Sequence, residues 1–202
     1  MTSKETLAKI IKTLEKRGIT VRFADTGTDD LEIGELRDGV MLLNRHSRDE
    51  LDMIFTIAHL FGHYCQFKNY NKYRHLVEAV AAPVPIELSD SFRDEFLAYE
   101  REAFGIGKTL IQEVRPPDDD WTTKYKCFMT ADFEHFWTYI TTGKKEAPTV
   151  FNQQLRTLYR QEGNNEHTNK HTAEHAGEDG IDALPIPEYS TTDLPHPEVI
   201  IF

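Results

Sequence analysis

The segment from residue 48 to residue 67 restricts the possible folds most, because it is apolar along one whole helix face. Its apolar residues recur at intervals of three and four, which is the spacing of one face of a helix: Leu51, Ile54, Phe55, Ala58, Phe61, Gly62 and Cys65. Just before it, Ser47 and Glu50 match a capping box, in which both side chains satisfy early backbone amides. The sequence therefore predicts a helix over about 48–67 that lies deep in the core.

The remainder of residues 1–160 predicts a few short strands and several more helices. Apolar spacing indicates a first helix over 4–17, which ends at Gly18. Strands are expected over 19–24, 31–36 and 40–44, and the pair Asp38-Gly39 favours a hairpin between the last two. Residues 68–90 show no regular pattern. Further helices are expected over about 90–114, capped by Ser89 or Asp90, and over about 131–142 and 149–160.

This order of elements predicts an α+β fold, with a small antiparallel sheet packed on helices. The expected compact domain covers residues 1–160, and an acidic, mostly flexible tail covers 161–202. The tail holds nine acidic residues and one basic residue, so it carries −8 of the net charge of −11. Its composition offers little apolar area to offset chain entropy. The apolar end, 199–202, is the exception and is expected to dock as a strand on the body, or on a partner.

Charge and apolar patterning exclude several classes of function. A nucleic-acid binder normally carries a basic face, and the body has a small negative net charge, so bulk nucleic-acid binding is not expected. No apolar stretch approaches the ~18 residues of a membrane span. The first 18 residues are charged throughout, unlike a secretory leader. Two cysteines, Cys65 and Cys127, predict a reducing, cytoplasmic setting.

A histidine pair in the apolar helix is the main candidate for chemistry. His59 and His63 are four residues apart, so they project from one face about one turn from each other. That spacing suits chelation of one metal ion. The alternative is two unrelated histidines, one packed in the core and one hydrogen-bonded at its edge.

The sequence FTIAHLFGHY at 55–64 closely resembles the metal-binding helix of the ImmA/IrrE-type metallopeptidases, which reads roughly FT-x-AHE-x-GH. Residues 40–50 also resemble that family's lead-in to the helix. The resemblance covers 40–67 well and 95–110 loosely. It implies a zincin-like fold, a zinc ion held by His59 and His63, and a protein or peptide as the partner or substrate. Active relatives cut a repressor or regulator in mobile elements and stress responses.

The resemblance also implies a third metal ligand on a later helix, within an E-x-x-A pattern. Glu100 to Ala103 fits this pattern, and Glu95 to Ala98 fits it in another register. We favour Glu100, because the residue three beyond Ala103 is the apolar Ile106. Glu95 is the alternate ligand.

One departure from the family pattern concerns the catalytic base. HExxH enzymes use the glutamate after the first histidine to move a proton, and this chain has Leu60 there. Three explanations stay open. The domain binds metal without hydrolysis and acts through protein contact in a phage or mobile-element-type setting. Alternatively, it is an active zinc-dependent endopeptidase with a relocated base, for which Glu102, Glu95 and Glu100 are candidates. In the third, the metal site itself is vestigial.

Other suggestive residues have simpler interpretations. Cys65 is expected to be a small core residue rather than a ligand. The aromatic run over 131–142 is expected to pack in the core. The tail histidines His167, His171 and His175 are expected to lie in a solvated linker, although their spacing would allow weak metal binding. The sequence leaves the oligomeric state open.

Overall fold

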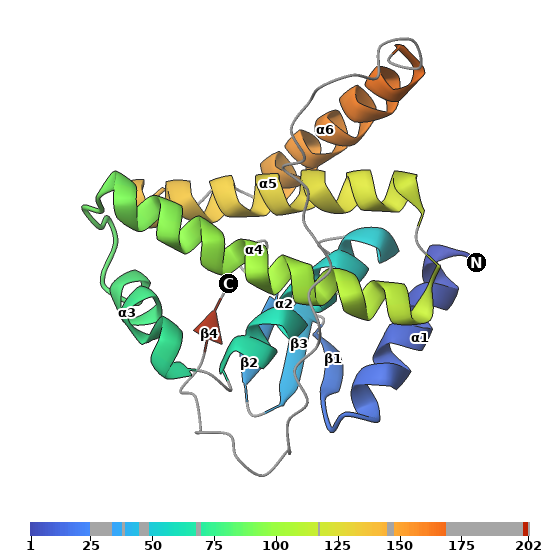
Figure 1. Cartoon of the computed structure of the whole chain (residues 1–202), viewed down its shortest axis with the longest axis horizontal. Helices are drawn as coiled ribbons and strands as arrows, with labels where there is room; N and C mark the ends of the chain where they lie inside the picture. The colour runs from blue at the N-terminus through green and yellow to red at the C-terminus, as the bar shows by residue number, and fades with distance from the viewer. Residues whose placement is uncertain are drawn as a thin grey trace.

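The computed structural model describes residues 1–24, 34–37, 39–44, 49–67, 70–116, 118–144, 148–168 and 200–201. Within these ranges it contains α1 (Ser3–Glu15), β1 (Thr20–Ala24), β2 (Gly34–Arg37), β3 (Val40–Asn44), α2 (Glu50–Phe67), α3 (Tyr70–Val80), α4 (Asp90–Val114), α5 (Asp119–Thr142), α6 (Pro148–Thr168) and β4 (Ile200–Ile201). Figure 1 shows α2 in the middle of the molecule, with α4 and α5 across one side of it and the small sheet on the other.

The predicted fold class is wrong, because the described residues are mostly helical and their small sheet is mixed, with one parallel pair of strands, rather than antiparallel. The strand order is β1-β3-β2-β4, and β1 pairs with β3 in parallel. The expected hairpin is present, since β2 and β3 are antiparallel and Gly39 has φ +72°. Of the two hairpin strands, β3 is more apolar than β2, and β3 is the one that lies beside β1. Its Met41 and Leu43 are fully buried, which favours the centre of the sheet.

Three helices differ from their predicted extents. Helix α3 occupies part of the segment that was expected to be irregular, and its Tyr73 and Leu76 are buried. Helix α5 begins at Asp119, twelve residues before the predicted start at 131, after the cap residue Asp118. Helix α6 extends to Thr168. Ser47, which was expected to cap α2, lies outside the described residues. The tail segment 169–199, and with it the tail's expected flexibility, also lies outside them.

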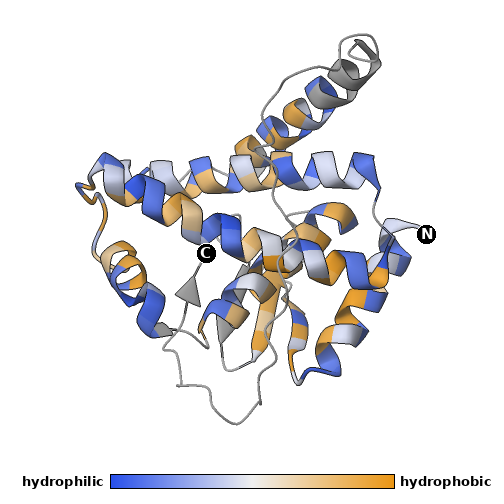
Figure 2. Ribbon diagram, viewed as in Figure 1, coloured by the Kyte–Doolittle hydropathy of each residue, from blue (hydrophilic) through white to orange (hydrophobic). Residues whose placement is uncertain are grey.

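Helix α2 is the central element of the main core, as its apolar pattern predicts. Every residue from Ile54 to Phe67 is buried, and the helix packs against α1, α4 and the strands. Its start is capped by Asp49, whose carboxylate accepts from the backbone amides of Leu51 and Asp52 at 3.1 Å each. Figure 2 shows hydrophobic and hydrophilic residues interspersed along the surrounding helices. A second, smaller aromatic core joins α3, α4 and α5 around Phe96.

Helices α2 and α4 cross at very short range because glycine lies at both contact points. A methyl group on Gly62 would lie 2.5 Å from the carbonyl carbon of Ala103 and closer still to its oxygen. On α4, a methyl group on Gly107 would lie 2.5 Å from the carbonyl oxygen of Ala58. Such distances leave no room for any side chain. The two glycines therefore set the separation of the helices, and with it the reach of α4 side chains toward α2.

Helix α6 is tied to the start of α2 by a buried acid. Asp52 is fully buried, and its carboxylate accepts hydrogen bonds from Arg156 at 2.5 Å and from the Tyr159 hydroxyl at 3.0 Å. Arg156 also pairs with Asp49 at 2.8 Å. Buried carboxylates stabilise a fold only while they keep their partners.

Replacing Arg156 with alanine should therefore lower the free energy of unfolding by about 2 kcal/mol, because Asp52 keeps Tyr159 but loses its cationic partner. Tyr159→Phe, which removes one hydrogen bond and keeps the ring, should cost about 1 kcal/mol. Urea unfolding followed by circular dichroism measures both. Equal stability of Arg156→Ala and the unmodified chain would contradict the role given to this contact.

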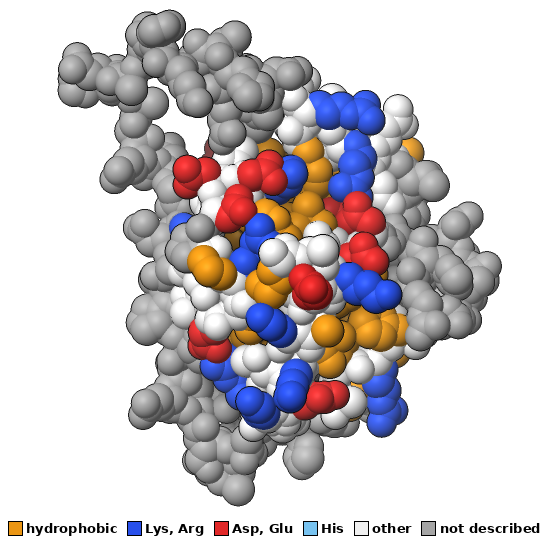
Figure 3. Space-filling view, turned by 90° about the vertical axis from the view of Figure 1, so that its right-hand side faces the viewer, with side chains coloured by type: hydrophobic (Ala, Val, Ile, Leu, Met, Phe, Trp, Pro, Cys, Tyr) orange, Lys and Arg blue, Asp and Glu red, His pale blue; other side chains and the backbone are white. Residues whose placement is uncertain are grey.

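The surface shows charges of both signs. On the face drawn in Figure 3, lysine and arginine side chains are interspersed with acidic ones and with small apolar areas. Among the described residues, no helix has both the length and the apolar character needed to cross a membrane.

Candidate metal centre

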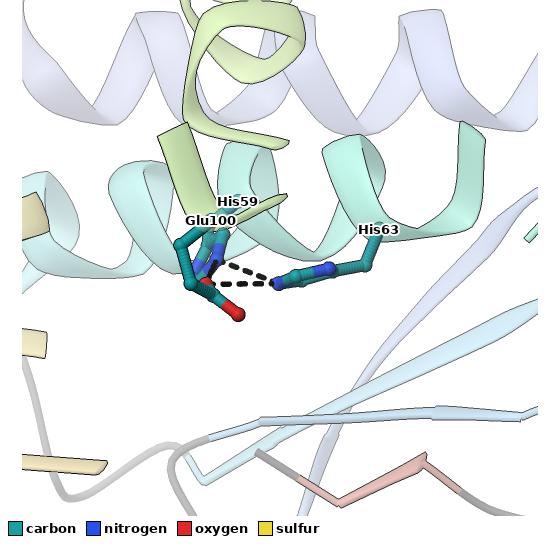
Figure 4. A group of neighbouring side chains, drawn as sticks. All are labelled: His59, His63 and Glu100. Carbon is teal, nitrogen blue, oxygen red and sulfur yellow. Dashed lines mark hydrogen bonds and ion pairs between the residues drawn. The ribbon is translucent and has the colours of Figure 1, made fainter. Parts of the chain in front are cut away.

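The two predicted histidines and the favoured glutamate converge on one point between α2 and α4. Nε2 of His59 lies 2.9 Å from Oε2 of Glu100 and 2.7 Å from Nε2 of His63, and the His63 Nε2 to Glu100 Oε2 distance is 3.3 Å. Figure 4 shows the two rings one turn apart on α2, with the carboxylate from α4 between them. The close helix crossing at Gly62 brings Glu100 within reach, since Ala103 is on the next turn of α4.

This group is closed off from solvent. The exposed fractions are 5% for His59, 0% for His63 and 4% for Glu100, and their ligand atoms all lie within 4.8 Å of one another. Two imidazole nitrogens and one carboxylate oxygen are also the protein ligands of many zinc enzymes. The three residues can therefore hold a metal ion.

Neighbouring residues fix which nitrogen of each histidine faces the centre. Oδ2 of Asp132, on α5, lies 3.1 Å from Nδ1 of His59, and a carboxylate only accepts, so this nitrogen carries a proton. Gln66 donates its amide to the backbone oxygen of Tyr99, so its Oε1 is the atom that faces Nδ1 of His63, at 2.9 Å. Both Nδ1 atoms thus donate outward. Both Nε2 atoms are left to face Glu100, as ligands of a shared ion would.

The position of the His59 ring is fixed further by packing. It stacks on Phe104 with ring centroids 3.9 Å apart and an angle of 19° between the planes. The Tyr99 hydroxyl lies 3.0 Å from Nδ1 of His63 and joins the centre to the second aromatic core. The rings are therefore held in place by packing as well as by hydrogen bonds.

The electrostatics of the group require a cation at its centre. With both Nδ1 atoms protonated, two neutral rings and a carboxylate direct three lone pairs at one another in a buried place, which is unfavourable. Without a metal, a proton fills this role. Burial alone lowers the pKa of His59, but hydrogen bonds with Asp132 and Glu100 outweigh it and raise the pKa to about 9. Burial lowers the pKa of His63.

The carboxylate is held in its charged form by the same neighbours. Burial alone would raise the pKa of Glu100, but the charge of His63 and the hydrogen bond with His59 lower it to about 2. Its second oxygen, Oε1, is buried and has no hydrogen-bond partner among the described residues. A buried charged oxygen without a partner is costly, so this atom too favours a cation nearby.

The donor atoms fit a zinc ion with a small adjustment. Bonds of about 2.0–2.1 Å in tetrahedral geometry place ligand atoms about 3.3 Å apart. The His63–Glu100 distance of 3.3 Å already matches, and the other two, 2.9 and 2.7 Å, need to widen by a few tenths of an ångström. Imidazole and carboxylate ligands also accept other transition metals, so the donor set does not by itself choose the ion.

The raised pKa of His59 makes the stability of the metal-free chain depend on pH. A folded-state pKa of about 9 exceeds the unfolded value of about 6.5, so the stabilisation is complete below pH 6.5 and disappears as pH rises through 9. The melting temperature of chelator-treated protein should therefore fall between pH 6.5 and 9.5. His59→Gln should show a smaller fall, and His75→Gln, at an exposed position of α3, should behave like the unmodified chain. A fall of equal size in His59→Gln would contradict this assignment.

The other sequence-predicted candidates lie elsewhere. Glu95, the alternate ligand, is exposed and pairs with His75 at 2.8 Å. Glu102 accepts a hydrogen bond from the Tyr73 hydroxyl and pairs with Lys72 at 3.3 Å, so it faces α3. Cys65 is buried in the main core, as expected. His171 and His175 lie outside the described residues.

Sequence reasoning missed the residues that support the ligands. Asp132, Gln66 and Tyr99 match no motif, and Asp132 lies within the aromatic run that was assigned mainly to core packing, with a protein-docking surface as the alternative. Two of these residues lie close to a ligand in the sequence and could have been found there. Gln66 is three residues after His63, and Tyr99 directly precedes Glu100. Asp132 is 73 residues after His59 in the sequence, and only the fold brings it to the ring.

Comparisons with known proteins do not identify a family. Neither a scan of family models nor searches of curated proteins and of solved structures found a match to this chain.

Proposed function

We propose that this chain is a zinc-binding, non-hydrolytic relative of the ImmA/IrrE-type metallopeptidases that acts through protein contact. His59, His63 and Glu100 would hold the ion. The phage or mobile-element-type setting follows from the resemblance of residues 40–67 to that family.

One observation carries the proposal. Nε2 of His59, Nε2 of His63 and Oε2 of Glu100 are buried and point at one another, while Nδ1 of each histidine is held by a hydrogen bond. Packing of neutral histidines does not require this arrangement, because a neutral core histidine needs a hydrogen-bond donor as the partner of its second nitrogen rather than two acceptors. A bound zinc ion would supply Lewis acidity and neutralise the carboxylate.

The residues around the three ligands support the proposed absence of hydrolysis. Leu60, where HExxH enzymes have glutamate, is 2% exposed and packs in the main core. Of the candidate bases among the described residues, Glu102 is engaged by α3 and Glu95 by His75. Asp132 faces the distal nitrogen of His59. General-base help is worth about 10²–10⁴ in rate, so its loss would slow a peptidase by about that factor.

The metal content of the purified full chain tests the proposal. The expected result is one zinc per chain by mass spectrometry, reduced at least tenfold in His59→Ala. His75→Ala is the matched control, because this histidine is exposed and lies outside the centre. A second control replaces His167, His171 and His175 with alanine, and zinc should stay at one per chain. Zinc that is lost with the tail histidines and kept in His59→Ala would overturn the proposal.

Hydrolysis is tested on the same preparations. The zinc-loaded chain should leave denatured casein and a random peptide library uncut, at the rate of His59→Ala. Cleavage that requires His59 would overturn the non-hydrolytic part of the proposal and favour the endopeptidase alternative. In that case Glu102→Gln and Asp132→Asn would show which acid replaces the missing base.

A further inference from the structure

Tyr99 belongs to the metal centre at one end of its side chain and to the second aromatic core at the other. Its hydroxyl lies 3.0 Å from Nδ1 of His63, and its backbone oxygen accepts the Gln66 amide at 2.8 Å. Its ring packs against Tyr73 of α3, with centroids 4.9 Å apart, and against Phe96 of α4. The residue is buried. A change in the position of this ring therefore affects both the centre and the core.

Helix α3 depends on the same core for its place on the body. Figure 1 shows it at one edge of the molecule, below the first half of α4. Its Tyr73 and Leu76 are buried in the second core. The Tyr73 hydroxyl also donates to Glu102, which is one-third exposed. The pair of His75 with Glu95, at 2.8 Å, is exposed on both sides, and such pairs contribute little to stability. Loss of apolar contacts in the second core should therefore release α3.

The docked position of α3 holds the Tyr99 hydroxyl at the centre. With α3 in place, the Tyr73 ring confines the Tyr99 ring, and the hydroxyl stays at Nδ1 of His63. Once α3 is released, one side of the Tyr99 ring faces water, and the side chain gains freedom to rotate. A histidine binds a metal more tightly when a fixed partner holds its second nitrogen. The form with α3 docked should therefore bind zinc more tightly than the form with α3 released.

We propose that zinc binding and the docking of α3 are coupled, and that Tyr99 is the positioning residue that links them. This deepens the proposed function, because it names what the ion regulates, and it rests on zinc being bound by His59, His63 and Glu100. Coupling between two sites is reciprocal, so zinc favours docked α3 by the same factor by which docked α3 favours zinc. An ion in a non-hydrolytic centre thereby controls a helix at the surface of the chain.

The expected coupling is about tenfold. Removing a partner of a metal-bound histidine typically weakens metal binding about 10–100-fold. Oε1 of Gln66 faces the same nitrogen of His63, at 2.9 Å, and continues to hold it when the Tyr99 hydroxyl is lost. The coupling through Tyr99 therefore lies at the lower end of this range.

The first test is a double-mutant cycle on the zinc affinity of the full chain, measured by competition with a coloured chelator. Leu76→Ala removes buried contacts of α3, and Tyr99→Phe removes the hydroxyl and keeps the ring. We expect each to weaken zinc binding about tenfold. The double variant should bind zinc like Tyr99→Phe within about twofold, because the link is already absent. The control is Leu14→Ala, in the main core on α1, and it should leave the affinity unchanged.

The cycle separates coupling from general loosening of the fold. Independent effects multiply, so a loss of about a hundredfold in the double variant would overturn the role of Tyr99. Equal zinc affinity of Leu76→Ala and the unmodified chain, with both folded by circular dichroism, would overturn the coupling itself. So would a loss in Leu14→Ala as large as that in Leu76→Ala.

Amide hydrogen exchange tests the reciprocal effect without any change in α3. Saturating zinc should slow exchange of residues 71–80 about tenfold in the unmodified chain, and by no more than about twofold in Tyr99→Phe. The tail histidines are the same in both forms, so zinc bound there does not produce a difference. Equal slowing in the two forms would overturn the role of Tyr99, and this result does not depend on how well Leu76→Ala folds.

Zinc content of the same preparations separates this proposal from the proposed function. An unmodified chain that binds no zinc at the centre would overturn both. One zinc per chain, lost in His59→Ala, together with exchange of residues 71–80 that is the same with and without zinc, would overturn the coupling alone.

Discussion

Gly62→Ala is expected to lower the free energy of unfolding by about 4 kcal/mol or more, and to leave little folded chain at 37 °C. The new methyl group would lie 2.5 Å from the carbonyl carbon of Ala103, and this obstacle is backbone, which cannot rotate away. Overpacking in a tight core usually costs about 1–3 kcal/mol, and the cost is larger where no side chain can adjust. Helices α2 and α4 would have to separate, and Phe104 and the ligands would lose their contacts.

The measurement is chemical denaturation, with Gly143→Ala as the control. Gly143 has φ +70° at the end of α5, and its nearest neighbours would be at ordinary distances of 3.7 Å or more. Alanine there should cost only about 1 kcal/mol, through the left-handed backbone. Gly107→Ala should resemble Gly62→Ala, since the carbonyl oxygen of Ala58 is in the way. A free energy of unfolding of Gly62→Ala close to that of Gly143→Ala would contradict the described helix crossing.

Asp132→Ala is expected to weaken zinc binding about 100-fold, although Asp132 is not one of the three ligands. Its carboxylate holds the Nδ1 proton of His59, which fixes the tautomer and makes Nε2 a better donor. Losses of about 10–100-fold are typical when such a partner of a metal-bound histidine is removed. Asp132→Asn keeps an oxygen that can accept the same hydrogen bond and removes only the charge, so we expect about a tenfold loss.

Competition with a coloured chelator measures these affinities. Glu134→Ala is the control, because Glu134 lies on the same helix, is exposed and pairs with Arg93 at 2.7 Å. It should bind zinc like the unmodified chain. If Asp132→Ala binds zinc as tightly as Glu134→Ala does, the hydrogen bond to His59 contributes nothing to the centre. Far-ultraviolet circular dichroism shows whether each variant is folded.

The sequence was sufficient to predict helix α2 and its histidine pair because their signals are local. The apolar spacing over 51–65 predicts α2 closely, and the i, i+4 spacing places His59 and His63 on one face. The choice of Glu100 over Glu95 was less secure, because both match the same minimal pattern. Five residues turn a helix by about 140°, so the two carboxylates lie on different sides of α4, and only one faces α2.

The sheet and the supporting residues depend on contacts between distant segments. The sequence of residues 19–44 does not predict that β3 lies between β1 and β2. That strand order depends on the burial of Met41 and Leu43 against helices that come later in the chain. Helix α3 was missed because its apolar residues, such as Leu76, pack on a second core whose other members come from α4 and α5. Asp132 was missed for the same reason.

The backbone contact between Gly62 and Ala103 has a consequence for which ions the centre can accept. Two helices in backbone contact cannot slide or spread easily, so the aperture formed by the two imidazoles and the carboxylate is nearly rigid. Calcium takes six to eight oxygen ligands at about 2.3–2.6 Å, and it would need a wider opening than these donors allow. Gly62 directly precedes His63 and Ala103 lies one turn beyond Glu100, so the close packing of the two helices limits how far the three ligand atoms can separate.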